Sequence, residues 1–501
     1  MVLSSRLASS SWISQSDRSH AIPGKEIYER PLGLLELGFY WDGVFERTAD
    51  TLQHAEIAVD STRLDPKHAC SYASISRTWM RLKQQFPLLG ARIEERDENA
   101  VFFVVAVESL HQCRPEEITF RNVSSADEAL DIMKSLAVNE RLLSNDFLAR
   151  LLVVRRTDVE HVFHIIINVS HAITDGMANI TILKTFVDEV ARDDASFKHW
   201  DLSQQLALSD STDRLYPLAK FSIAKQRWRL AVAKIITARY ARPSTGGHSL
   251  PRIFSQNTPY TPAHSKSLSF SFSPEQSQIV IANCRKQKLT FGNAYPIIGQ
   301  IAVTRLLLRR YLRGEISEEE WEFRKREPMS SAGPMNLRSF QDKAWHDAGG
   351  AKHVCVSIGF FYFALPIMPL GAASSFRPGA ELPAFETLLS RKRFWLRSRS
   401  VRSQADRFIR NPLLLELGSI ALPARVERAR SVGLQWRKEK GSLTGVTNTI
   451  LSPMEQASTS FIFCNGGSSM GNVRSYSTLF SLLSLNSRNR RLIFSFHVSI
   501  P

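Results

Sequence analysis

The chain of 501 residues contains few cysteines, and none of them form a pair at metal-binding spacing. The five cysteines are far apart and odd in number, which argues against a disulfide-stabilised secreted scaffold and against a zinc site. Walker A and Rossmann glycine motifs are absent, and so is any nucleic-acid-binding motif. We therefore expect a cytoplasmic protein with no metal, no permanently bound cofactor and no nucleic-acid partner.

Long apolar runs are also scarce. Residues 1–25 are rich in serine and lack the unbroken apolar core of a secretory signal, so we expect a disordered leader there. The longest uncharged run, residues 354–376, has the length of a membrane-spanning helix. Pro366 and Pro369 would interrupt such a helix, and the β-branched and aromatic start of the run favours a buried strand followed by a loop.

Acidic residues are missing from two long stretches of a chain whose net charge is +16. None occurs between Asp213 and Glu275, and none follows Glu455. Within the first stretch, residues 214–240 alternate Lys and Arg with apolar residues at near-helical spacing. This pattern is typical of a helix that touches an anionic membrane surface, and equally of a solvated basic face above an ordinary packing stripe.

A second basic cluster also has helical spacing, which favours a solvated helix face over a phosphate or nucleic-acid site. It consists of Arg391, Lys392, Arg393, Arg397, Arg399 and Arg402.

Strand-like and helix-like patterns recur in both halves of the chain, and a hydrophobic content of 43% is enough for a large core. The composition changes to Pro, Ser, Thr, Gly and His over residues 241–265, as in a crossover between domains. We therefore expect a leader at 1–25, a first lobe at 26–240, a linker at 241–265, a second lobe at 266–473 and an atypical tail at 474–501.

The most informative motif lies at the exit of the most apolar strand pattern, residues 161–169. His171 and Asp175 are four positions apart in the sequence HAITDG, and a helical pattern follows from Met177 to Val190. A histidine with an ordinary pKa near 6.5 can accept a proton from a hydroxyl, amine or thiol at neutral pH. The spacing alone is weak evidence, because a strand-end histidine is often a satisfied structural residue.

Three further segments accompany this motif in order along the chain. Phe86–Ile93 (FPLLGARI) precedes it, Pro334–Arg338 (PMNLR) stands before the strand pattern in 354–365, and Gly466–Val473 (GGSSMGNV) follows another strand pattern, 461–464. Together they resemble the acyltransferase superfamily with the chloramphenicol acetyltransferase-like fold. This superfamily includes plant BAHD acyltransferases, fungal alcohol and trichothecene acetyltransferases and peptide-synthetase condensation domains. The chain is most similar in character to the fungal alcohol acetyltransferases.

The resemblance implies a monomeric α/β protein of two lobes, each a mixed sheet with flanking helices, and a tunnel between the lobes. Acyl-CoA, as co-substrate, and a small hydroxyl- or amine-bearing acceptor would meet at His171, the general base. Asp175 would hold the motif in place through an ion pair, with Arg338 as the expected partner. Gly176, Asn336, Arg338, Ser468 and Ser469 would contact the substrates, with Asn336 and the two serines near the acyl donor.

Several positions depart from the family pattern. Ser170 stands where condensation domains carry a second histidine, and the plant DFGWG segment is absent. Arg474 stands where an acid usually follows the small-residue loop, so the tail could be a product of altered splicing, although alternation over residues 491–500 also suits a half-buried strand. A noncatalytic or degenerate acyltransferase-like binding protein therefore stays open, as does a basic peripheral-membrane protein that uses residues 214–240.

Overall fold

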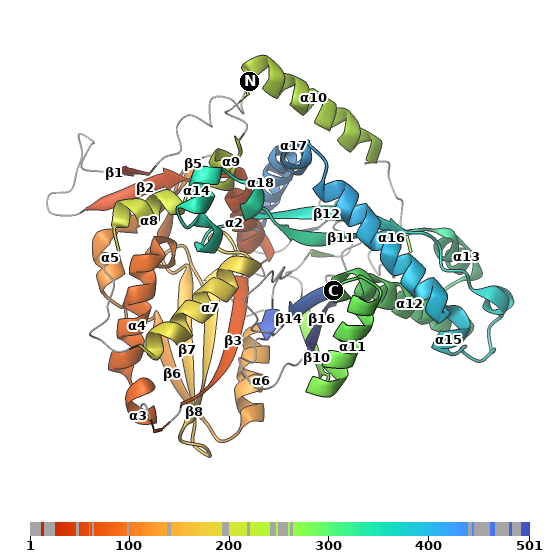
Figure 1. Ribbon diagram of the computed structural model, residues 1–501, viewed down its shortest axis with the longest axis horizontal. Helices are drawn as coiled ribbons and strands as arrows, with labels where there is room; N and C mark the ends of the chain where they lie inside the picture. Colours follow the sequence, from red (N-terminus) through yellow and green to blue (C-terminus); the bar gives the residue numbers. More distant parts are fainter. Residues whose placement is uncertain are drawn as a thin grey trace.

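A computed structural model shows two lobes side by side, with the first half of the chain in one and most of the second half in the other (Figure 1). It describes residues 12–14, 26–46, 50–59, 61–62, 65–97, 100–137, 142–192, 200–217, 221–240, 247–248, 259–260, 264–438, 443–444, 461–465, 480–482 and 492–500. Most of the expected linker therefore lies outside the described residues.

A five-stranded sheet forms the centre of the first lobe, in the order β15-β3-β8-β7-β6. Its central strand is β8 (Val162–Ser170), which is antiparallel to both neighbours. The other strands are β3 (Asp50–Ala58), β6 (Ile118–Val123), β7 (Ala149–Arg156) and β15 (Phe480–Leu482).

Helices cover both faces of this sheet, which explains why β8 is buried along nearly its whole length. Because side chains alternate along a strand, Ile165 and Ile167 join the core cluster of α4 (Tyr72–Gln85) and α7 (Gly176–Val190). Ile166 packs instead into the cluster of α6 (Ala126–Ala137).

A second sheet of the first lobe has the order β1-β2-β5-β4 and is antiparallel throughout. Its strands are β1 (Ile13–Ser14), β2 (Ile27–Pro31), β4 (Arg92–Asp97) and β5 (Ala100–Ala106). The expectation of a disordered leader is wrong at β1, because Ile13 and Ser14 pair with Glu29 and Tyr28. The other leader residues lie outside the described ranges, Trp12 excepted.

The second lobe contains a sheet in the order β10-β16-β14 and the hairpin β11-β12. These strands are β10 (His264–Ser271), β14 (Phe461–Asn465), β16 (Leu492–Ile500), β11 (Met329–Asn336) and β12 (Ile358–Leu365). Of the two alternatives for the tail, the strand over 491–500 forms as β16. Another part of the tail, β15, pairs with β3 of the first lobe in parallel orientation.

Helices complete the second lobe in two apolar clusters, of which one includes side chains of the β11-β12 pair and the other joins α12 and α13 to the segment after β12. The longer helices are α11 (Pro274–Lys286), α12 (Phe291–Leu312), α13 (Glu318–Arg326) and α16 (Arg391–Ile409). Ser273 and Gln276 form the capping box that starts α11, in which each side chain accepts a hydrogen bond from the backbone N–H of the other residue.

Helices also join the two lobes. α18 (Leu422–Lys438) belongs to the second-lobe range by sequence, yet it packs along α2 (Leu34–Glu46) of the first lobe. At its end, Arg437 forms an ion pair with Glu95 at 2.8 Å.

Shorter elements connect these layers: α3 (Pro66–Ala69), α5 (Val107–His111), α8 (Leu202–Leu208), α9 (Thr212–Leu215), α14 (Lys343–Asp347), α15 (Phe385–Leu388), α17 (Leu414–Ser419), β9 (Pro259–Tyr260) and β13 (Leu443–Thr444). The uncharged run 354–376 contains β12 and irregular turns, as its prolines predict. Among the residues described, no helix combines the length and the apolar character needed to cross a membrane.

Candidate functional site

The motif that contains His171 forms a buried turn between β8 and α7. β8 ends at Ser170, and α7 begins at Gly176. Asp175 is the N-cap of α7, and its Oδ1 accepts hydrogen bonds from the backbone N–H groups of Met177 and Ala178 at 3.0 and 2.9 Å. The carboxylate thus accepts from two of the backbone N–H groups that have no partner within the first turn of a helix. These two bonds fix the turn to the start of α7.

The turn also holds the His171 imidazole in one orientation. Nδ1 lies 2.6 Å from the carbonyl oxygen of Thr174, so this nitrogen carries the proton and donates it. Nε2 is then the basic atom, and it is buried with no hydrogen-bond partner among the described residues. An unpartnered lone pair on a side chain that is 3% exposed is the feature expected of a base awaiting a proton donor.

An aromatic ring covers one face of the imidazole. Phe39 of α2 stacks on His171 with ring centroids 3.7 Å apart and an interplanar angle of 12°. Burial lowers the pKa of His171, although the Thr174 carbonyl and the nearby Asp175 charge act in the opposite direction. The side chain is therefore neutral at pH 7, the form that a general base requires.

An ion pair joins this turn to the second lobe. Arg338 Nη1 lies 2.8 and 3.1 Å from the two carboxylate oxygens of Asp175, which confirms the pairing that the family resemblance implied. Arg338 Nη2 donates to the carbonyl of Cys355 at 2.8 Å, and the Ser357 N–H donates to Asp175 Oδ2 at 2.7 Å. Both charged side chains are almost fully buried, so the ion pair fixes the position of one lobe relative to the other.

A small cavity lies beside the ion pair and not at His171. It has a volume of about 10 Å³, room for roughly one water molecule. Gly176 and Asn336 line it together with Asp175 and Arg338. Asn336 also accepts a hydrogen bond from the Arg338 backbone N–H at 3.0 Å, so it holds the arginine segment in place.

The structure thus brings five predicted residues together at the lobe junction: His171, Asp175, Gly176, Asn336 and Arg338. Ser468 and Ser469 lie outside the described residues, as does the whole of their loop, 466–473. The tunnel that this loop would border therefore stays a prediction.

Three contributions to the site were not predicted. Phe39 comes from a helix far from the motif in sequence, and Ser357 acts through its backbone N–H. Thr174 lies within the motif, but only the turn geometry shows that its carbonyl selects the His171 tautomer. The apolar helix pattern at Leu34–Glu46 could have indicated a buried aromatic, but not its partner.

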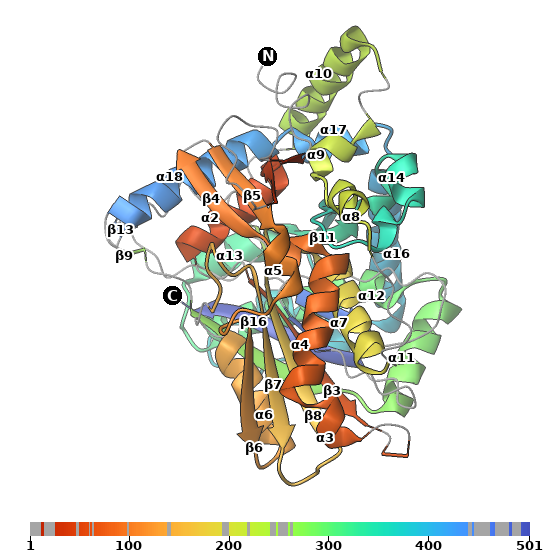
Figure 2. The same ribbon diagram turned by 90° about the vertical axis from the view of Figure 1, so that its left-hand side faces the viewer.

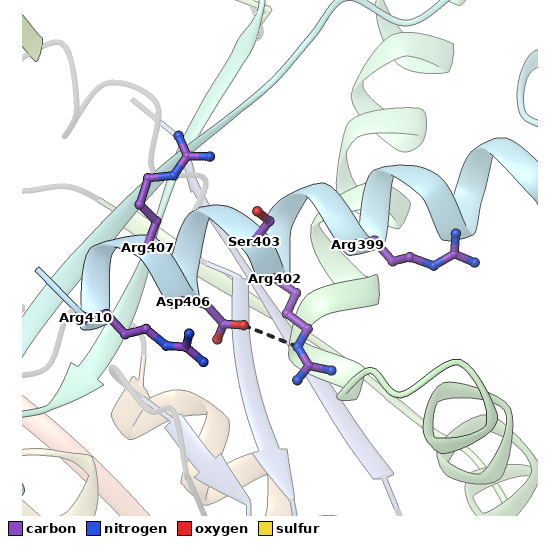
Figure 3. A pocket seen from close by; sticks show the side chains of 6 residues that line it. All are labelled: Arg399, Arg402, Ser403, Asp406, Arg407 and Arg410. Atoms are coloured by element: carbon purple, nitrogen blue, oxygen red, sulfur yellow. Dashed lines mark hydrogen bonds and ion pairs between the residues drawn. The ribbon is translucent and has the colours of Figure 1, made fainter.

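The arginine cluster of α16 differs in part from expectation. Arg399 and Arg402 are exposed and line a surface groove of about 420 Å³, and its lining residues come from α16 and from Arg410, which caps the end of that helix (Figure 3). Arg397 corrects the prediction of a solvated face: it is buried and donates to Gln300 Oε1 at 2.9 Å and to the Ile367 carbonyl at 2.6 Å.

Within the described ranges, no group of acidic, His and Cys side chains could hold a metal ion.

Comparisons with known proteins identify the fold. No protein-family model matches the sequence, and no curated protein matches it. The structure is similar to that of TRI3 trichothecene 15-O-acetyltransferase from Fusarium sporotrichioides, with a TM-score of 0.56 and 13% identity over 85% of this chain and 80% of that one. The chain therefore has the two-lobe chloramphenicol acetyltransferase-like α/β fold.

Weaker similarities extend to two other solved structures. Polyketide synthase associated protein 5 from Mycobacterium tuberculosis gives a TM-score of 0.48 at 13% identity, over 94% of this chain and 93% of that one. The first condensation domain of the CDA synthetase gives 0.48 at 12% identity, over 76% and 74%.

Proposed function

We propose that the protein is a CoA-dependent acyltransferase that transfers an acyl group from acyl-CoA to a hydroxyl or amine of a small metabolite. The observation that carries the proposal is the His171 imidazole, with Nδ1–H bound to the Thr174 carbonyl and with Nε2 buried and unpartnered by any residue that the structure describes. The fold shared with a trichothecene acetyltransferase supports the class of reaction.

In this reaction His171 Nε2 removes the proton from the acceptor O–H or N–H as that atom attacks the thioester carbonyl carbon. The new C–O or C–N bond forms, the C–S bond breaks, and the imidazolium returns the proton to the departing CoA thiolate. The Thr174 carbonyl keeps the Nδ1–H tautomer throughout and stabilises the imidazolium. Asp175 acts as a positioning residue, because its carboxylate oxygens are occupied by Arg338 and by backbone N–H groups.

The donor side of the site is proposed from the resemblance. Asn336 lies at the cavity beside the ion pair, and Ser468 and Ser469 would complete the wall near the acyl-CoA. We expect the protein to act as a monomer, since these residues all belong to one chain.

A noncatalytic binding protein of the same fold is the alternative. The observation in its favour is that His171 is 3% exposed, so a substrate reaches Nε2 only after side chains move. Such a protein would bind CoA or a metabolite without turnover.

Release of free thiol from acetyl-CoA and longer acyl-CoAs, in the presence of pooled alcohols and amines, tests the proposal. His171→Ala should reduce acceptor-dependent release by about 10²- to 10⁴-fold. His346→Ala, at an exposed position of α14, is the matched control and should retain activity. Equal turnover in the wild type and in His171→Ala would refute the mechanism, whereas CoA binding without turnover would favour the alternative.

A further inference from the structure

One exposed helix takes no part in the proposed chemistry. α10 (Ile223–Tyr240) lies at the upper margin of the molecule in both ribbon views (Figures 1 and 2). One side of it packs on α17: Ala233 is buried, and Arg229 binds Glu416 and the Pro412 carbonyl. The opposite side is exposed.

The exposed side carries a continuous apolar stripe. Trp228 and Ile235 are each 70% exposed. At 3.6 residues per turn they share an arc of about 80° with the exposed residues Ala224, Ala231 and Ala238. Large apolar side chains gathered on one exposed helix face indicate a surface that another molecule or phase covers.

Cations border this stripe on both edges. Arg227 and Lys234 follow one edge, Lys225 lies near the other, and all three are exposed. Within the described parts of the chain, neither Arg227 nor Lys234 pairs with an acidic side chain. The sequence offers no acid between residues 214 and 274, so no acidic side chain of the helix itself balances these cations.

We propose that α10 is an interfacial helix that binds the surface of an anionic lipid membrane. The stripe with Trp228 and Ile235 would enter the boundary between headgroups and acyl chains, and Arg227, Lys234 and Lys225 would bind lipid phosphates. Three features favour a lipid surface over a protein groove: cations flank the stripe instead of interrupting it, small alanines separate its large side chains, and a tryptophan sits where interfacial helices place one.

This proposal rests on α10 alone and not on acyl transfer. A helix of 18 residues is about 27 Å long, so it would lie along the surface without any part of the chain spanning the bilayer. The two lobes and His171 would stay on one side of the membrane.

Co-sedimentation of the full chain with phosphatidylcholine vesicles, with and without phosphatidylserine, tests the proposal. We expect binding only when phosphatidylserine is present, and weaker binding as salt is added. Trp228→Ala with Ile235→Ala, and separately Arg227→Glu with Lys234→Glu, should each weaken binding at least about tenfold. The matched control is Leu396→Ala with Ile279→Ala, which removes side chains that are 63% and 61% exposed on other helices and should leave binding unchanged.

Three results would overturn the proposal. The wild type could fail to sediment with phosphatidylserine vesicles, or the control pair could weaken binding as much as the α10 pair. The wild type could also be a dimer in light scattering that Trp228→Ala with Ile235→Ala dissociates, which would make a second copy the partner. Thermal unfolding shows that each variant is folded, and thiol release in solution, which none of these side chains should affect, reports separately on the proposed function.

Discussion

Arg338 in the second lobe and Asp175 in the first form a buried, two-bonded ion pair, with Nη1 at 2.8 and 3.1 Å from the carboxylate oxygens. Asp175 also caps α7, and that helix begins directly after the turn that orients His171. One carboxylate therefore connects the start of α7, the second lobe and the basic imidazole.

Asp175→Asn should destabilise the protein by about 3–5 kcal/mol, because the buried Arg338 guanidinium loses its counter-charge. Urea unfolding measures the loss. Asp347→Asn is the control, since it breaks an exposed ion pair with Lys343 and should leave the unfolding curve unchanged. Adding Arg338→Met to Asp175→Asn should recover part of the stability, because the unpaired buried charge is then removed. If Asp175→Asn and Asp347→Asn lowered the free energy of unfolding equally, that result would contradict a buried ion pair.

Phe39→Leu should lower kcat/KM for acyl transfer by roughly 10- to 100-fold, because the stacked ring no longer fixes the imidazole. Burial lowers the pKa of His171, so the wild-type rate should decrease only below pH 6.5. In Phe39→Leu, water reaches the imidazole and the acidic limb of the pH profile should move up toward 6.5. The control is Phe408→Leu, which removes a ring that contacts Tyr362 in the second lobe. It should change neither kcat/KM nor the pH profile. A lower melting temperature with an unchanged pH profile would assign Phe39 a purely structural role.

Gly433→Ala should lower the thermal midpoint, because an added Cβ would lie 2.8 Å from Cε3 of Trp41, a ring that is 1% exposed. The site lies where α18 packs on α2, so the substitution separates the helices that join the lobes. Gly418→Ala in α17 is the matched helical control: its Cβ would meet nothing within 4 Å, and it should be neutral or stabilising by up to about 1 kcal/mol. Similar midpoints for both variants would show that this helix contact is loose.

The buried pair of His54 and His164 should make the protein sensitive to acid. His54 Nε2 lies 2.9 Å from His164 Nδ1, and burial, together with the charge on His164, lowers the pKa of His54 to about 3. The unfolded chain takes up this proton near pH 6.5 and the folded chain does not, so stability present above pH 6.5 is lost as the pH falls toward 3.

The loss from one such histidine is ~1.4 kcal/mol per pH unit. Urea unfolding between pH 7.5 and 5 should therefore show a smaller pH dependence for His54→Gln than for the wild type. His161→Gln, at an exposed position just before β8, should keep the wild-type slope. An unchanged slope in His54→Gln would mean that the pair is already protonated in the folded state.

Much of the local structure follows from the sequence. The apolar strand expected over residues 161–169 forms as β8, and the helix expected from Met177 to Val190 forms as α7. Both depend on residues close together in the chain, as do the end of α4 before Pro87 and the capping box of α11. The turn with His171 and Asp175 is local in the same way. Its partner Arg338 was expected only through the family resemblance, and the ion pair confirms that expectation.

Other contacts between distant segments could not be predicted. Nothing near Phe39 in the sequence indicates that its ring stacks on His171, and α18 lies in the second-lobe range although it packs on the first lobe. Arg397 resembles its exposed neighbours in α16 but lies buried against Gln300.

Strands, helices and caps form where the local pattern of residues indicates, because periodicity and capping act between residues a few positions apart. The stacking of Phe39 on His171, and the choice of which face of α10 stays in solvent, follow instead from the folded arrangement of the helices and sheets. Those outcomes depend on how whole elements pack, since packing brings together side chains that the chain separates by more than a hundred residues.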